Sequence, residues 1–224
     1  MHKWSRELRP YIKTELLLPS LLYAVGIETA LSRQVVGMGG TRSPGVETFE
    51  LVAAIAHALS EGGICTISGG VPGVDLACHL ASASSPGGTV AVLANPVLEG
   101  LAANGWGSTT LDDEITKNGL FVSEYAERVE VGGDEFRERL LQRDRIISGL
   151  SNVFLAFECN VDSATVDTAR RALAQGAIVM AVHPPVVRAR RGTFELSGDP
   201  RVISIDARTS PVTEITAAIL SKLD

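Results

Sequence analysis

The chain has 224 residues, a formal net charge of −6 and 45% hydrophobic residues, of which few are aromatic. Its length fits one domain of ordinary to large size. The negative charge excludes a globally basic nucleic-acid binder, although a local basic patch stays open. Three widely spaced cysteines without a CxxC pair predict reduced thiols in a cytoplasmic protein, not disulfides or a zinc site. No apolar run reaches the roughly 18–20 residues of a membrane span, so we expect no membrane contact.

The N-terminal stretch differs from the rest of the chain. A basic start, Met1 to Arg9, is followed by the mostly apolar segment Leu16 to Val25, which Pro19 interrupts. The segment is too short for a bilayer span and lacks a convincing signal-peptide cleavage site. We therefore predict a short helical N-terminal extension over residues 1–32, followed by one α/β domain over residues 33–224.

From residue 34 onward, short apolar runs alternate with longer amphipathic ones. The apolar runs predict strands at 34–37, 64–68, 89–94, 120–123, 153–157, 178–182 and 202–205. The amphipathic runs predict helices at 46–60, 74–82, 112–117, 136–149, 164–175 and 212–223. This alternation is typical of right-handed βαβ crossovers. It indicates an α/β, three-layer Rossmann-like fold with a mostly parallel sheet flanked by helices, whose ligands bind beyond the carboxyl ends of the strands.

Two glycine-rich loops follow the first two predicted strands. Small residues let the backbone approach a phosphate, and the next helix offers its positive end. The alternative is that the glycines only shape tight turns and that Asp75 caps its helix. His79, four residues after Asp75, fits a satisfied structural pair better than acid/base machinery. The candidate phosphate-binding residues are Gly40, Thr41, Arg42 and Ser43 in the first loop, and Ser68, Gly69, Gly70, Gly73 and Asp75 in the second.

An arginine-rich helix and a third small-residue loop add further candidates. Arg143 and Arg145 lead directly into an apolar segment, which places them near the sheet edge where they could meet phosphates. A solvated, salt-bridged helix face is the alternative interpretation. Ser163 and Thr165 start the helix after the fifth strand, where their hydroxyls cap the helix or bind a phosphate.

Catalytic signatures are missing from the sequence. It contains no GxSxG elbow, HExxH pair, Walker A lysine motif or Cys–His nucleophile spacing. The first glycine run also departs from the dinucleotide fingerprint. Glu124 and Glu158 end apolar strands and are possible pocket acids. We therefore predict a binding protein with no catalytic residues, no metal ligands and no cofactor.

Three segments occur in an order that resembles the DNA-processing protein A family (DprA/Smf). Residues 40–44 resemble its glycine/arginine turn, and residues 68–75 with His79 resemble its SGxAxGID…AH segment. Residues 143–151 are similar to its RNRIISGLS segment, and residues 163–176 to its SGSLITA…ALxQGR stretch. Asp144 stands where the family has asparagine, and Val71 and Pro72 replace small residues.

The resemblance implies an extended Rossmann-like fold that holds single-stranded DNA in a positively charged pocket. It also implies self-association, here as a homodimer, and handover of the DNA to a RecA-type recombinase. The phosphate contacts that it implies fall on Arg42, Ser68, Gly69, Gly70, Gly73, Arg143 and Arg145. A second hypothesis is a pocket for a nucleotide or nucleotide-derived signal, as in the wider superfamily. Hydrolysis is the less favoured form of that hypothesis, because the PGGxGTxxE motif of the phosphoribohydrolases is not found.

Overall fold

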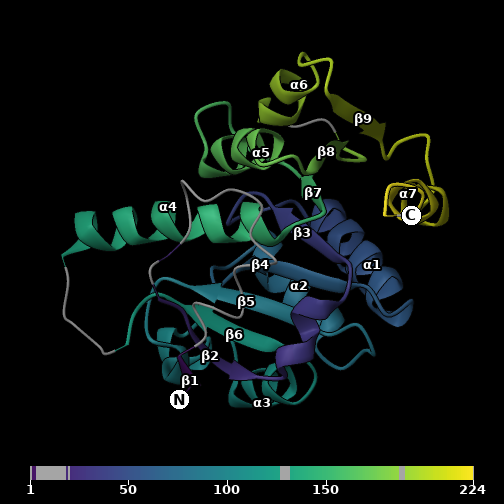
Figure 1. The fold of residues 1–224 in the computed structure, drawn as a ribbon. Helices are drawn as coiled ribbons and strands as arrows, with labels where there is room; N and C mark the ends of the chain where they lie inside the picture. The colour runs from purple at the N-terminus through teal and green to yellow at the C-terminus, as the bar shows by residue number, and fades with distance from the viewer. Residues whose placement is uncertain (1, 4–18, 20, 127–131, 187–189, 224) are drawn as a thin grey trace.

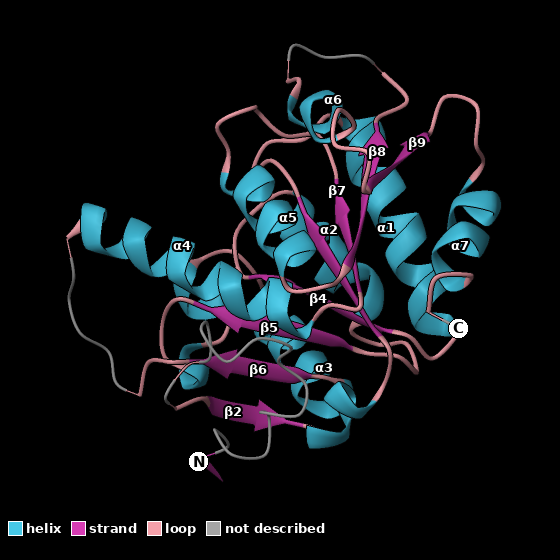
Figure 2. Ribbon diagram, turned by 45° about the horizontal axis from the view of Figure 1, so that its top comes forward, coloured by secondary structure: helices cyan, strands magenta, loops and turns pink. Residues whose placement is uncertain are grey.

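The computed structural model describes residues 2–3, 19, 21–126, 132–186 and 190–223. Its strands form one sheet in the order β1-β2-β6-β5-β4-β3-β7-β8-β9. The pairs from β6 to β9 are parallel, and β1–β2 and β2–β6 are antiparallel. Helices cover both faces, which gives the three layers visible in Figures 1 and 2. The expected α/β fold with a mostly parallel sheet is therefore confirmed.

The described elements follow the predicted alternation, with small shifts at their ends. The strands are β1 (His2–Lys3), β2 (Tyr23–Gly26), β3 (Val35–Gly39), β4 (Cys65–Gly69), β5 (Thr89–Leu93), β6 (Leu120–Ser123), β7 (Val153–Ala156), β8 (Ile178–His183) and β9 (Val202–Asp206). The helices are α1 (Val46–Glu61), α2 (Val74–Ser82), α3 (Thr109–Asn118), α4 (Gly133–Leu150), α5 (Ala164–Ala174), α6 (Gly192–Leu196) and α7 (Val212–Leu220). Three short 3₁₀ turns are η3 (Glu28–Ser32), η4 (Val97–Glu99) and η5 (Ala102–Asn104).

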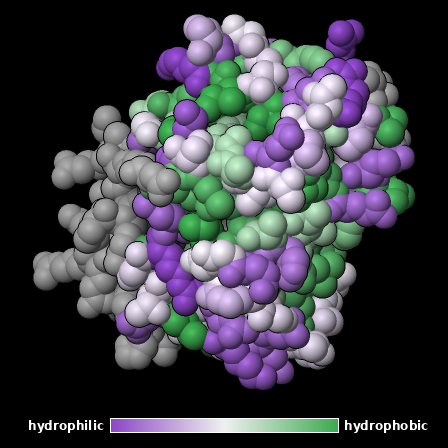
Figure 3. Space-filling view, turned by 90° about the vertical axis from the view of Figure 1, so that its right-hand side faces the viewer, coloured by the Kyte–Doolittle hydropathy of each residue, from purple (hydrophilic) through white to green (hydrophobic). Residues whose placement is uncertain are grey.

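Successive strand residues face opposite layers, as the two-residue period of a strand requires. Val35 and Phe154 pack in the apolar cluster beneath α4 and α5, whereas Val36 and Leu155 pack in the cluster beneath α1, α2 and α7. A third cluster lies under α3 and includes Phe121. The side of the molecule that carries α1 and α7 shows hydrophobic and hydrophilic residues interspersed (Figure 3). Among the described residues, no helix is long and apolar enough to cross a bilayer.

The N-terminal expectation needs a correction. Within the helical extension expected over residues 1–32, residues 23–26 instead form strand β2, which pairs antiparallel with β6, and residues 28–32 form the 3₁₀ turn η3. Four residues are too few for strand periodicity to be recognised, and pairing with β6 decides their conformation. Much of the remaining stretch lies outside the described residues, so the division at residue 33 stays a prediction.

Strand order reverses at the centre of the sheet. β3 lies between β4 and β7, and the chain moves outward from it in both directions. In open α/β sheets the crevice at such a reversal, beyond the carboxyl ends of the strands, is the usual ligand site. The loops after β3 and β7 meet there, together with α4 and the start of α5.

Candidate functional site

An open pocket of about 900 Å³ occupies this crevice. The loop after β3, the arginine-rich face of α4 and the first turns of α5 form its walls. Seven of the predicted site residues line it: Gly40, Thr41, Arg42, Asp75, Arg143, Ser163 and Thr165. Six do not: Ser43, Ser68, Gly69, Gly70, Gly73 and Arg145. The structure thus brings the first and third predicted loops to one site, together with one of the two arginines.

The second glycine-rich loop lies behind the pocket wall. Ser68 is fully buried and its hydroxyl donates to the Met38 carbonyl at 2.7 Å, so this hydroxyl is committed within the fold. Gly73, which precedes α2, has a φ of +89°, and a Cβ there would lie 2.3 Å from the Thr41 carbonyl oxygen. The packing of the chain therefore accounts for a small residue at both positions.

His79 belongs to the same buried layer. Its Nε2 lies 2.6 Å from the Gly69 carbonyl oxygen and its Nδ1 lies 2.9 Å from Oγ1 of Thr89. Burial lowers the pKa of His79, which favours the neutral ring. Both ring nitrogens are occupied by partners other than Asp75, so His79 is a structural histidine and not half of an acid/base pair.

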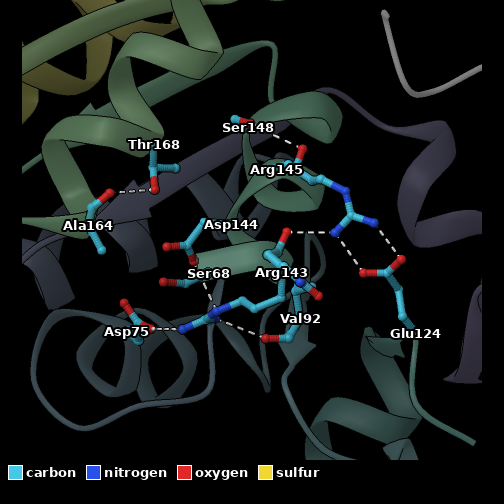
Figure 4. Close-up of polar contacts among 12 residues, drawn as sticks. Ser68, Asp75, Val92, Glu124, Arg143, Asp144, Arg145, Ser148, Ala164 and Thr168 are labelled. Carbon is cyan, nitrogen blue, oxygen red and sulfur yellow. Dashed lines mark hydrogen bonds and ion pairs between the residues drawn. The ribbon is translucent and has the colours of Figure 1, made fainter. Parts of the chain in front are cut away.

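Arg143 forms the floor of the pocket and is only 5% exposed. Its Nη1 donates to the Val92 carbonyl at 2.9 Å and its Nη2 lies 3.6 Å from Oδ2 of Asp75 (Figure 4). Its Nε lies 3.0 Å from Oδ1 of Asp144, an ion pair that is not aligned as a hydrogen bond. A Cβ at Gly69 would lie 1.5 Å from Nη1, so glycine is required there to make room for the guanidinium.

Asp144, the residue that departs from the family pattern, shares this buried position. Burial raises the pKa of the Asp144 carboxyl from its ordinary 3.8 to about 6, with Arg143 acting in the opposite direction and Asp75 in the same one. One guanidinium therefore serves two carboxylates. Near neutral pH, the pocket floor carries a proton-sensitive negative charge.

Arg145 points away from the pocket. Its two Nη atoms donate to the two carboxylate oxygens of Glu124 at 2.6 and 2.5 Å, and Nη1 also donates to the Gln142 carbonyl at 2.7 Å (Figure 4). The sequence pattern predicts the same role for Arg143 and Arg145. The structure gives each of them an internal ion pair, of which only the one at Arg143 is at the pocket.

The pocket wall also contains residues outside the predicted phosphate-binding set, among them Trp106, which the sequence offers as a candidate for base stacking, and Arg137 of the arginine-rich helix. Arg137 is exposed on α4, and neither it nor Arg42 has an ion-pair partner within the described part of the chain. Trp106 and Phe136 lie with ring centroids 6.3 Å apart and pack on a small apolar cluster that includes Leu140. The spacing of Phe136, Leu140 and Arg143 on α4 is a helical stripe. From this spacing, the sequence could have predicted that these three side chains lie on one face of α4.

Charge in the pocket is mixed. Three arginines and four aspartates line it: Arg42, Arg137, Arg143, Asp75, Asp144, Asp162 and Asp167. Arg143 is paired internally, so Arg42 and Arg137 are the arginines of the described lining whose guanidinium groups are exposed to an external anion. No cluster of three or more metal-ligating side chains occurs among the described residues.

Residues 3–207 match the family DNA recombination-mediator protein A. The chain belongs to this family. It is 31% identical over 170 residues to a DNA processing protein of Mycobacterium tuberculosis (75% of this chain, 42% of the relative). It is 30% identical over 165 residues to the DNA processing protein DprA of Bacillus subtilis (73% and 53%). The chain thus spans about half the length of these relatives.

Solved structures agree on the fold of the family. The DNA processing protein A of Helicobacter pylori superposes with a TM-score of 0.73 at 22% identity, covering 91% of this chain and 88% of that one. The protein from Streptococcus pneumoniae gives 0.72 at 24% identity, covering 84% and 64%. A molybdenum cofactor carrier protein from Chlamydomonas reinhardtii gives 0.54 at 17% identity, covering 85% and 98%. The Rossmann-like fold is therefore shared with the family and with small-ligand carriers.

Proposed function

We propose that this chain binds single-stranded DNA in the pocket at the β3/β7 reversal. The observation that carries the proposal is that one open pocket is lined both by two exposed arginines, Arg42 and Arg137, and by the aromatic rings of Trp106 and Phe136. Arginines bind the phosphates, and unpaired bases stack on aromatic rings. Family membership supports the proposal, and the DNA processing protein A of H. pylori, which shares the fold, binds single-stranded DNA.

The proposal extends to partners and location. A family defined as a recombination mediator is expected to pass its DNA to a RecA-type recombinase, and we propose that this chain does so as a homodimer in the cytoplasm. Cys65, Cys78 and Cys159 are free and buried, and burial raises the pKa of each thiol, as expected of inert thiols in a reducing compartment.

A second candidate is a small nucleotide-derived ligand. The four aspartates of the pocket favour it, since a compact anion needs fewer cations than a long phosphate backbone. Fluorescence anisotropy of a labelled oligonucleotide at low and physiological salt, with unlabelled mononucleotide as competitor, separates the two. Binding that weakens steeply with salt and resists the mononucleotide supports DNA; full competition by the mononucleotide supports the small ligand.

Removing the two rim arginines is expected to weaken oligonucleotide binding. In the double variant Arg42→Ala/Arg137→Ala, the slope of log K against log salt should fall by about 0.7 for each phosphate that the protein no longer neutralises. The control is Arg201→Ala, because Arg201 is exposed near β9 and pairs with Asp199, away from the pocket. An unchanged slope in the double variant would remove Arg42 and Arg137 from the site.

Removing the indole ring of Trp106 should weaken oligonucleotide binding without changing the dependence of the affinity on salt concentration. Trp106→Ala is expected to weaken oligonucleotide binding by about 1–3 kcal/mol, the usual worth of one stacked base. Phe194→Ala is the matched control, because Phe194 is an exposed aromatic residue outside the pocket. Equal affinities of the two variants in the same titration would rule out stacking on Trp106.

A further inference from the structure

The N-terminus of α1 already holds an anion, the side chain of Glu158. This residue follows β7 and is only 1% exposed. Its Oε2 accepts hydrogen bonds from the Gly45 amide at 3.0 Å and from the Thr48 hydroxyl at 2.8 Å. Its Oε1 is paired with Nη1 of Arg190 at 2.5 Å. A backbone amide, a hydroxyl and a guanidinium therefore converge on one carboxylate.

These three donors are of the kind that bind a phosphate. In nucleotide-binding α/β proteins, a phosphate sits on the helix that follows a glycine-rich strand-to-helix loop. Here α1 follows β3 through such a loop, and the carboxylate of Glu158 occupies that position. Although burial alone would raise it, the pKa of Glu158 lies below its ordinary value because Gly45, Thr48 and Arg190 bond to the charged form. The group is therefore a permanent anion at neutral pH.

The surrounding loop is built around the same residue. The Thr41 amide donates to the backbone carbonyl of Glu158 at 2.8 Å, and Arg190 also donates to the Ser43 carbonyl at 2.8 Å. Ser43 lies outside the pocket lining, and its role as a phosphate ligand stays a prediction. A ligand phosphate at α1 would have to displace a buried carboxylate that has all its partners, against repulsion between like charges.

We propose that Glu158 is a specificity-determining residue, an internal substitute for a ligand phosphate. It closes the α1 N-terminus to mononucleotides and leaves the rim beside Arg42 and Arg137 open to phosphates. The consequence for selectivity rests on the proposed function. A nucleic-acid backbone can pass across the rim, whereas a terminal phosphate would have to enter the loop, so the protein prefers the backbone to a mononucleotide.

The test compares the wild-type chain with Glu158→Ala and Glu158→Gln by thermal unfolding in inorganic phosphate, in dTMP, and in chloride of equal ionic strength. For the wild type we expect no saturable rise in melting temperature with phosphate or dTMP, beyond the general salt effect of phosphate that all variants share. Glu158→Ala should melt lower in chloride and recover with phosphate concentration, as mass action requires of a ligand that binds the folded state. Glu158→Gln, which still fills the site, should melt lower without recovery. Adding Arg190→Ala to Glu158→Ala should abolish the recovery.

A folded Glu158→Ala variant that gains nothing from phosphate would overturn the proposal. If that variant does not fold, the wild-type chain decides by NMR. Saturable shifts of the Gly45 and Thr48 amides on titration with dTMP would refute closure of the loop, and unmoved amides support it. Failure of the wild type to bind any oligonucleotide would refute the proposed function instead, without altering the phosphate results.

Discussion

Replacing Arg143 by methionine is expected to lower the free energy of unfolding by about 3–5 kcal/mol, the usual cost of removing one partner from a buried ion pair. The side chain is 5% exposed and holds the Val92 carbonyl together with Asp75 and Asp144. Without the guanidinium, two neighbouring carboxylates stay buried with no cation between them. Methionine keeps much of the aliphatic volume, so the loss reports mainly on the charge.

Urea denaturation of matched variants measures this loss. Arg137→Met, on the same helix but exposed, should change stability by less than about 0.5 kcal/mol, as is usual for surface positions. Adding Asp144→Asn to Arg143→Met should restore part of the loss, because one uncompensated carboxylate is removed. Equal stability of Arg143→Met and Arg137→Met would show that the buried cluster contributes nothing to the fold.

Much of the fold could be predicted because it depends on local patterns. The helix at 74–82 and the strand at 120–123 match their predicted bounds, since a glycine precedes each of them and polar residues follow the apolar pattern. Strand β2 could not be predicted because its conformation comes from pairing with β6, almost 100 residues away in the chain. A four-residue segment carries no period of its own from which to read that pairing.

The site could be predicted only in part, and for physical reasons. Arg143 and Arg145 are two residues apart on a helix, which turns about 100° per residue, so both cannot face one pocket. That geometry was available from the sequence. The contact of Glu158 with Gly45 and Thr48 was not, because it spans 113 and 110 residues and no local pattern announces it. The glycines of the second loop predict a phosphate cradle, yet Gly69 is needed instead for the close approach of Arg143.

Replacing Asp144 by asparagine is expected to stabilise the protein above pH 6 and to strengthen DNA binding. The folded-state pKa of about 6 exceeds the ordinary 3.8, so protonation of Asp144 favours the folded state. This contribution is fully present below about pH 4 and is lost as the pH rises through 6. A neutral amide avoids the loss, worth up to about 3 kcal/mol for a shift of two pKa units. The gain of the variant should therefore vanish toward pH 4.

Binding should follow the same titration, since a phosphate backbone beside the pocket disfavours the charged carboxylate. The Asp144 pKa of about 6 lies between about pH 5.5 and about pH 7.5. Over this range the affinity of the wild type for an oligonucleotide should fall more steeply than the affinity of Asp144→Asn. Asp167→Asn, at an exposed aspartate of the same pocket, controls for the simple loss of one negative charge. Weaker binding by Asp144→Asn at pH 7.5 would contradict the expectation that the Asp144 carboxylate opposes DNA binding. The carboxylate would then be needed to position Arg143, and its charge would serve the site instead of opposing the DNA.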